Sequence, residues 1–218
     1  MNRVFWPALM MTFLMVVAIG CDESTTEPEP NPTPVDLSTP DSVVVSLARV
    51  LEAMDAEVYG DLLFDSSRDG DPSFEFYFTS FDLGEGFPYQ FSLEEELSCL
   101  GHILNGDAGV TPEGESIPGV ISIQVDFTPQ GDDWESVGGL LVEGDVSPPG
   151  ATRRRFETDY FLTLDYSPGE GEIGGFLIQD QVEIYLVPAD EGYRIWKQFD
   201  LITRASSDIS WSQVKWLY

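Results

Sequence analysis

An acidic residue, Asp180, interrupts an otherwise apolar face of a predicted strand over residues 175–187. It has the same parity as five apolar side chains, those of Phe176, Ile178, Val182, Ile184 and Leu186. Because alternate residues of a strand face the same side, we expect Asp180 to point into a dry interior. Burial raises the pKa of a carboxyl group, which suits it to act as a general base or to bind a ligand. The alternative is a β-bulge or a strand break at residues 179–181, which would turn Asp180 outward.

Tyr160 and His102 are the other candidates for a catalytic role. Tyr160 shares the apolar face of the preceding predicted strand with Phe156, Leu162 and Leu164, so its hydroxyl could reach the same interior. Tyrosines in such positions are more often core residues with one polar end. His102 is the only histidine, and it lies off the apolar stripe of a predicted helix. A general base has to reach the proton it removes, so an ordinary helical histidine is the simpler interpretation.

The segment from Asp65 to Asp71 has part of the pattern of a calcium-binding loop. Asp65, Asp69 and Asp71 could supply oxygen ligands, and a glycine stands at the sixth position. The twelfth position is Phe76, where an EF-hand requires a bidentate glutamate, and Arg68 adds a positive charge inside the loop. A single histidine, and a single cysteine beyond the N-terminal region, exclude His-rich and Cys-rich metal sites. We therefore predict neither a metal nor a cofactor.

Arg153, Arg154 and Arg155 form the one basic run of the chain. Such a run could bind an anionic partner. Alternation along the predicted strand, however, sends Arg153 and Arg155 to its polar side, where Glu157 and Asp159 follow. We expect these charges to compensate one another.

The overall charge excludes whole classes of partner. The chain has 10 Lys and Arg residues against 39 Asp and Glu residues, which gives a formal net charge of −29. Nucleic acid would be repelled by such a protein, and so would anionic lipid. Acidity of this kind typically keeps a surface solvated, and it is compatible with a saline habitat or a cationic ligand.

The first 21 residues indicate export. A basic residue precedes an apolar stretch that is short for a membrane span and ends at small residues. Residues 18–21, Ala-Ile-Gly-Cys, resemble the lipobox of bacterial lipoproteins. The resemblance implies a signal peptide over residues 1–20 and a lipid on Cys21, and the alternatives are an uncleaved anchor or a secreted protein with a free Cys21. With Cys21 acylated, Cys99 is the remaining thiol, and we expect it in the core.

Residues 21–38 are expected to tether the protein to a bacterial membrane through the N-terminal lipid. The segment is rich in proline and acidic residues and nearly lacks apolar ones, so it should stay extended and disordered. Asp22, directly after the lipidated cysteine, resembles the inner-membrane retention signal of some bacterial lipoproteins. The choice between inner and outer membrane stays open. The protein is expected in the cell envelope, with its domain outside the cytoplasm.

A single domain over residues 39–218 should follow, with helices ahead of a long sheet. Thr39 before Pro40 is typical of a helix start, and Asp55 can cap a second helix over residues 56–64. A third helix should begin after Ser92 at a capping box, with its buried stripe at Leu93, Leu97, Leu100 and Leu104. In the second half, alternation between apolar and polar residues predicts strands over residues 121–127 and 156–164. Further strands are expected over residues 73–79, 138–142, 175–187 and 193–203, which clusters of Pro, Gly and Asp separate.

This order of elements resembles the NTF2-like superfamily, which includes SnoaL-like proteins. The resemblance rests on the helix that follows Thr39, the strand around residues 74–78 and the ending of the chain, where residues 194–196 and 211–215 look like closing strands. It implies an α+β fold in which N-terminal helices pack on a curved antiparallel sheet that forms a cone. Enzymes of the superfamily, such as isomerases, dehydratases and polyketide cyclases, typically work from an acidic residue or a histidine inside the cone.

The sequence leaves three functions open. The one we favour is a non-catalytic NTF2-like domain of a bacterial lipoprotein, which binds a small ligand in the cone or a protein partner in the envelope. The second is an isomerase or dehydratase that uses Asp180, assisted by Tyr160. The third is a structural or assembly role through a homodimer formed by the sheet face. Acidic residues on that face, such as Glu157 and Asp159, indicate a wetted surface instead.

Overall fold

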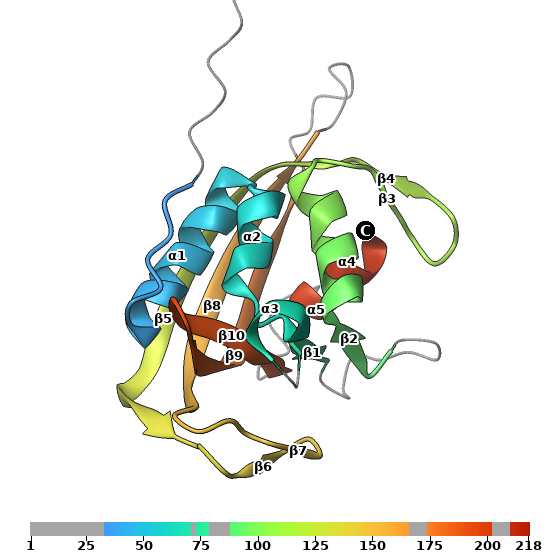
Figure 1. Cartoon of the computed structure of the whole chain (residues 1–218). Helices are drawn as coiled ribbons and strands as arrows, with labels where there is room; N and C mark the ends of the chain where they lie inside the picture. Colours follow the sequence, from blue (N-terminus) through green and yellow to red (C-terminus); the bar gives the residue numbers. More distant parts are fainter. Residues whose placement is uncertain (1–32, 71–72, 79–87, 166–173, 202–209) are drawn as a thin grey trace, which may run out of the picture. The chain divides into compact units, whose positions relative to one another are not determined.

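A layer of helices covers one face of a six-stranded sheet (Figure 1). The structure is a computed structural model, and it describes residues 33–70, 73–78, 88–165, 174–201 and 210–218. The helices are α1 (Pro40–Ala53), α2 (Ala56–Leu62), α3 (Ser66–Asp69), α4 (Leu93–Leu104) and α5 (Trp211–Leu217). We call the sheet face that packs against α1, α2 and α4 the inner face, and the opposite one the outer face.

The sheet has the strand order β2-β1-β10-β9-β8-β5. Its four long strands are antiparallel: β5 (Val120–Ser136), β8 (Thr152–Leu164), β9 (Gly175–Ala189) and β10 (Gly192–Leu201). The short strand β1 (Glu75–Tyr77) is parallel to β10 and antiparallel to β2 (Gln90–Ser92). The predicted α+β class, with helices packed on a curved sheet, is confirmed, but the sheet is mixed because of β1.

Two small hairpins stand outside this sheet. They pair β3 (Gly109–Val110) with β4 (Ser116–Ile117) and β6 (Leu141–Val142) with β7 (Asp145–Val146). The strand predicted over residues 138–142 is therefore wrong, because only its last two residues pair, and they pair within a hairpin. Gly138 and Gly139 precede this hairpin, and the φ of 83° at Gly139 favours a turn over a strand.

The predicted helix starts are confirmed. Thr39 caps α1 and accepts a hydrogen bond from the Ser42 amide at 3.1 Å. Asp55 caps α2 in the same way, and Ser92 forms the predicted capping box with Glu95 at the start of α4. These side chains satisfy amides that the first turn of a helix leaves without a partner.

The buried face of α4 differs from the predicted one. Leu100, Leu104 and Cys99 are buried as expected, but Leu97 is 36% exposed and Ile103 is buried. Glu96, a residue that a periodicity argument would place in solvent, is fully buried. The helix is rotated toward a buried partner of Glu96 on α5, which is described below.

The closing segment is a helix and not the predicted strand. Residues 211–215 belong to α5. Ser210 accepts a hydrogen bond from the Gln213 amide at 3.1 Å, and the Gln213 side chain accepts one from the Ser210 amide at 2.8 Å. This reciprocal pair is a capping box, which starts a helix at this point.

Two bulges set which residues reach the inner face. In β5 the register shifts between Val120 and Ser122, which leaves Ile121 56% exposed, although alternation predicts it to be buried. In β10 the register shifts between Ile195 and Lys197. Ile195 packs in the core of the inner face, while Trp196 packs in a second, smaller core on the outer face. A bulge reverses the parity of all residues that follow it.

Residues 33–38, at the end of the predicted tether, contact the domain. The Tyr193 amide donates to the Leu37 carbonyl at 2.8 Å, and the Asp36 amide donates to the Ser46 hydroxyl at 2.8 Å. Gly192 has a φ of 119°, and a Cβ atom there would collide with the Leu37 carbonyl, so a glycine is required. The described chain thus begins along α1 and the turn between β9 and β10. Cys21 and the predicted signal peptide lie outside the described residues, among which no helix has the length and apolarity needed to cross a membrane.

Lys197 connects the β6–β7 hairpin to the outer face. Its side chain is fully buried, and its ammonium donates to Glu75, to the Tyr77 hydroxyl at 3.0 Å and to Asp145 of β7 at 2.9 Å. Burial is the main cause that raises the pKa of Tyr77 to about 12, so this hydroxyl stays a neutral hydrogen-bonding group.

Replacing Lys197 should destabilise the domain. Lys197→Met leaves the Glu75 and Asp145 carboxylates without their buried cation, which is expected to lower the free energy of unfolding by about 3 kcal/mol. Urea denaturation measures this change. Arg49→Met removes the same charge from an exposed position of α1 and should change stability by less than about 0.5 kcal/mol. Equal effects of the two substitutions would show that the ion pair contributes nothing specific.

Candidate functional site

Buried side chains of the inner face, of α2 and α4 and of α5 form one connected network of contacts. We call them the α5 cluster. It consists of Tyr59 of α2, Glu96 of α4, Tyr160 of β8, Asp180 of β9, Asp200 of β10 and, on α5 itself, Trp211, Ser212 and Lys215. The cluster includes two of the three residues that the sequence offered as catalytic candidates.

Asp180 lies on the inner face and is 4% exposed. One of its carboxylate oxygens accepts a hydrogen bond from the Trp211 amide at 2.8 Å. The Trp211 ring stacks on Tyr160, with ring centroids 4.5 Å apart and an interplanar angle of 2°. Burial, followed by the nearby carboxylates of Asp200 and Asp180, raises the pKa of Tyr160 well above its usual value. Tyr160 is therefore a neutral core residue beneath α5.

Asp200 is the site residue that sequence reasoning missed. It is fully buried, and its carboxylate accepts hydrogen bonds from the Ser212 amide at 3.2 Å and from the Ser212 hydroxyl. Burial and the like charge of Asp180 raise the pKa of Asp200 to about 7. Simple alternation from Ile195 places Asp200 on the opposite face, and only the bulge before Lys197 brings it inward.

Glu96 and Lys215 form an ion pair in the interior. The Lys215 ammonium and the Tyr59 hydroxyl both donate to the same Glu96 oxygen, at 2.6 Å and 2.8 Å. The ammonium also lies 3.4 Å from the centroid of the Phe76 ring, a cation–π contact. Cys99 donates from its thiol to the Lys215 carbonyl at 2.7 Å, and burial raises the pKa of this thiol to about 12. Cys99 is thus an unreactive core thiol in contact with α5.

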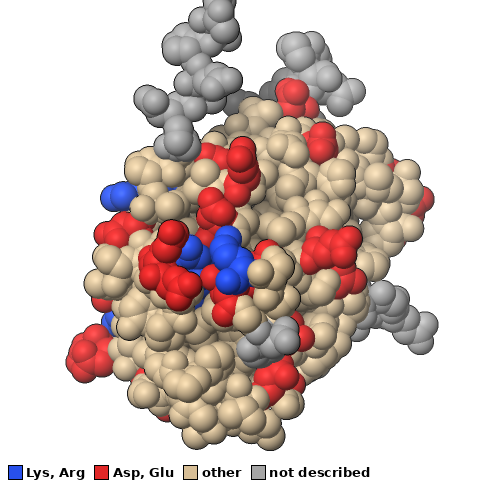
Figure 2. Space-filling view, viewed as in Figure 1, with Lys and Arg blue, Asp and Glu red and all other residues tan. Residues whose placement is uncertain are grey.

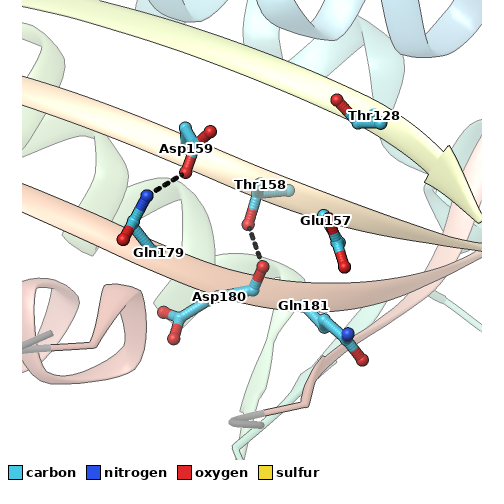
Figure 3. A pocket seen from close by; sticks show the side chains of 7 residues that line it. All are labelled: Thr128, Glu157, Thr158, Asp159, Gln179, Asp180 and Gln181. Carbon is cyan, nitrogen blue, oxygen red and sulfur yellow. Dashed lines mark hydrogen bonds between the residues drawn. The ribbon is translucent and has the colours of Figure 1, made fainter. Parts of the chain in front are cut away.

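The hollow next to the Asp180 backbone opens on the outer face of the sheet. Figure 3 shows a hollow between β5, β8 and β9, in which Gln179 donates to Asp159 at 2.9 Å and Thr158 donates to the Asp180 carbonyl at 3.2 Å. Its volume is about 110 Å³. Sites for small organic molecules usually measure about 300 Å³ or more. Most of the side chains that line it, such as those of Glu157, Asp159 and Gln179, lie on the outer face, so this hollow does not open onto the Asp180 carboxylate, which α5 binds on the inner face.

The remaining candidates do not join the α5 cluster. The His102 side chain is 53% exposed and lies 3.0 Å from Asp107. Asp65 caps α3, and Asp69 pairs with Arg68 at 3.0 Å, while Asp71 lies outside the described residues. The described part of the chain contains no group of three side chains that could hold a metal ion.

Acidic side chains dominate the surface, and the arginines near α3 and the β9–β10 turn are paired with acidic neighbours. Figure 2 shows acidic side chains over the whole visible face and a small group of basic ones with acidic neighbours. Arg68 pairs with Asp61 as well as with Asp69, and Arg194 lies 3.8 Å from Glu191. Burial is the main cause that lowers the pKa of Arg194.

No protein-family model matches the sequence, and no curated protein matches it. Among solved structures, the chain is similar to a candidate dehydratase of the NTF2-like family from Streptomyces avermitilis, at 14% identity over 77% of this chain and 100% of that one, with a TM-score of 0.47. An NTF2-like superfamily protein from Salmonella enterica shares 9% identity over 76% and 89% of the two chains, with a TM-score of 0.45. A candidate SnoaL-like polyketide cyclase from Shewanella denitrificans shares 14% identity over 75% and 89%, with a TM-score of 0.41. These neighbours carry NTF2-like and SnoaL-like names, and at such identities they indicate no ligand and no activity for this chain.

Loss of the Glu96–Lys215 pair should loosen α5 and expose Cys99. Lys215→Met, made in a Cys21→Ser background in which Cys99 is the only thiol, is expected to raise the rate of Cys99 alkylation by about 10-fold or more, because each 1.4 kcal/mol lost from docking gives a factor of ten. Mass spectrometry follows the modification. Arg49→Met, the matched charge control, should leave the rate unchanged. An unchanged rate in Lys215→Met would mean that the ion pair does not hold α5.

Asp200 should make stability depend on pH. Its pKa is about 7 in the folded protein, against about 3.9 in an unfolded chain. Between these values the folded state holds a proton that the unfolded state has lost, so this residue lowers the free energy of unfolding by about 1.4 kcal/mol per pH unit as the pH rises from about 4 to about 7.

The variant Asp200→Asn isolates this contribution, because asparagine does not titrate. The stability of the unchanged protein relative to the variant should fall between about pH 5 and about pH 7 and then stay constant. Urea denaturation across this range measures the difference. Asp180, Lys215, Ser212 and Tyr160 face the carboxylate and remain present in both proteins. A difference that does not change with pH would contradict the raised pKa.

Proposed function

We propose that this chain is a lipid-anchored protein of the bacterial cell envelope whose NTF2-like domain binds a small ligand or a partner protein and performs no catalysis. The observation that carries this proposal is the state of the inner carboxylates. Asp180 and Asp200 accept hydrogen bonds from amides of α5, and Glu96 is paired with Lys215. A general base has to come within about 3 Å of a substrate proton, a place that α5 occupies.

Recognition outside the interior is the consequence of this arrangement. Because α5 fills the space above the inner carboxylates, a ligand or partner would meet the outer face, the loops and the hairpins. Slow alkylation of Cys99 in the unchanged protein would support a closed interior. Rapid alkylation would indicate that α5 leaves the interior frequently.

An isomerase or dehydratase is the second candidate, and one observation favours it. The pKa of Asp200 is about 7, which suits a general base at neutral pH. In such an enzyme α5 would have to leave the interior, and Asp200 would take the role that the sequence assigned to Asp180.

An assembly role through the sheet face is less well supported. The outer face exposes Phe161 and Leu177, which are 44% and 56% exposed and pair across β8 and β9. The neighbouring pair on the same face, Asp159 and Gln179, is polar, and its side chains bind one another. Two apolar side chains next to a polar pair form a patch much smaller than a stable dimer interface requires.

The lipid anchor can be tested directly. The full-length chain expressed in a bacterium is expected in the membrane fraction, with a mature N-terminus at acylated Cys21 that mass spectrometry can identify. Cys21→Ser should move the protein out of the membrane fraction or leave it unprocessed, because the acyl chains supply the membrane affinity. Cys99→Ser, the matched control, should not change the fractionation. A mature N-terminus at any other residue would refute the anchor.

A further inference from the structure

The outer edge of the sheet contains a larger hollow, which the predicted functions do not use. The register between β5 and β8 shifts between Gln130 and Glu135, so the residues between them leave the ladder. The hollow that results measures about 450 Å³, within the range of small-molecule sites. Three arginines line it, Arg153, Arg154 and Arg155, together with Asp133, Glu135 and Glu183. We call it the arginine groove.

Arg153 is fully engaged within the groove. It donates from Nε to Glu135 at 2.9 Å and from Nη1 to the Tyr185 hydroxyl at 3.2 Å, and its Nη2 lies 2.9 Å from Glu135. The hydrogen bond with Glu135 is the largest cause that raises the pKa of Arg153. The predicted local compensation therefore holds for this residue, which acts as a strut between β5 and β8.

Arg155 uses only part of its hydrogen-bond donors. It donates from Nε to Glu183 at 2.8 Å, and its side chain is 54% exposed. Its two terminal amino groups make no other hydrogen bond or ion pair within the described ranges. Glu183 is held in turn by the Tyr185 hydroxyl at 2.8 Å, so the carboxylate that binds Arg155 is itself positioned. An arginine held in this way can bind a carboxylate through two parallel hydrogen bonds.

Arg154 leaves a buried donor unused. Its side chain is 10% exposed, and its terminal amino groups bind Asp41 at 3.2 Å and the Gly131 carbonyl at 2.6 Å. Its Nε has no hydrogen-bond partner in the described part of the chain. Arg154 pairs with Ile184 in the ladder, so its side chain lies on the inner face, whereas Arg155 pairs with Glu183 and points to the outer face. Arg154 therefore holds the edge of the sheet against α1 and does not face a ligand in the groove.

We propose that the arginine groove binds a small monocarboxylate that carries hydroxyl or ammonium groups next to its carboxylate, such as an acidic sugar or an amino acid. The carboxylate would meet the two terminal amino groups of Arg155 on the outer face. Asp133 and Glu183 offer acceptors for the neighbouring donors of the ligand. The inference deepens the proposed function and rests on its claim that recognition takes place outside the interior.

The charge of the groove selects against more highly charged anions. The guanidinium groups of Arg153 and Arg155 are paired with the carboxylates of Glu135 and Glu183, and the whole chain has a net charge of −29. A phosphate or a polyanion would meet no excess of positive charge to offset this repulsion. A ligand with one negative charge and several hydrogen-bond donors matches both the arginines and the carboxylates of the lining.

Titration of the full mature chain tests this inference, with D-glucuronate and L-glutamate as the two probes and D-glucose as the uncharged control. Heteronuclear NMR follows the Nε–H signal of Arg155, with that of Arg154, on the opposite face of β8, as an internal control. We expect a saturable shift of the Arg155 signal with at least one acid and none with glucose. The acid that binds more tightly tells hydroxyl donors from an ammonium donor.

Arg155→Gln should weaken binding by about 10-fold or more, because it removes the bidentate contact. Arg155→Lys, which keeps the charge without the fork, is expected to bind with intermediate affinity. Arg49→Gln, the matched control, should bind like the unchanged protein. Thermal unfolding of each variant confirms that it is folded.

Two results would overturn the inference. One is the absence of saturable shifts up to about 10 mM of both acids, where a site with a Kd of about 1 mM would be mostly filled. The other is an equal loss of affinity in Arg155→Gln and Arg49→Gln, which would reveal an effect of net charge alone. In either case protection of Cys99 from alkylation still reports separately whether the interior is closed, so failure of the groove does not decide the proposed function.

Discussion

Contact between α5 and the buried carboxylates is the interaction on which the interior depends. A seven-residue helix has too few internal hydrogen bonds to persist alone, so α5 exists because the inner face binds it. The inner face depends on α5 in turn. Glu96 is fully buried, and an isolated carboxylate in that position would cost several kcal/mol without the Lys215 ammonium. The Lys215 ammonium of α5 thus makes the burial of Glu96 possible, and the buried carboxylates in turn hold α5 in place.

The two lysines of the chain are both used inside the protein. Lys215 is 2% exposed on the inner face, and Lys197 is fully buried on the outer face. Lys215 joins α5 to α4 through Glu96. Lys197 joins the β6–β7 hairpin to the sheet through Asp145. In a chain with so many acids, a buried ammonium can be paired several times over. The many acidic residues thus make the surface acidic and also supply the carboxylates that pair with the two buried lysines.

Local signals in the sequence predicted the local parts of the fold. Thr39, Asp55 and Ser92 begin helices because a cap involves residues two or three positions apart, and Asp180 lies inward because parity holds along its strand. Asp200 could not be assigned, since a bulge in β10 reverses parity between it and Ile195. The burial of Glu96 depends on a partner 119 residues away, which no periodicity reveals. The capping box of Ser210 and Gln213 can be recognised in the sequence, but the family resemblance led to the prediction of a strand there.

A closed interior changes where this domain can be specific. Binding inside would require a ligand to replace every contact of α5, including an ion pair and two amide–carboxylate hydrogen bonds, before it gained anything new. The arginine groove makes no such demand, because Arg153 and Glu183 already hold the lining in place and Arg155 keeps free donors at its exposed edge. A site that is ordered before binding loses little conformational entropy when the ligand arrives. The bulge of β5 therefore provides a site that a ligand can enter directly, whereas α5 blocks access to the carboxylates of the inner face.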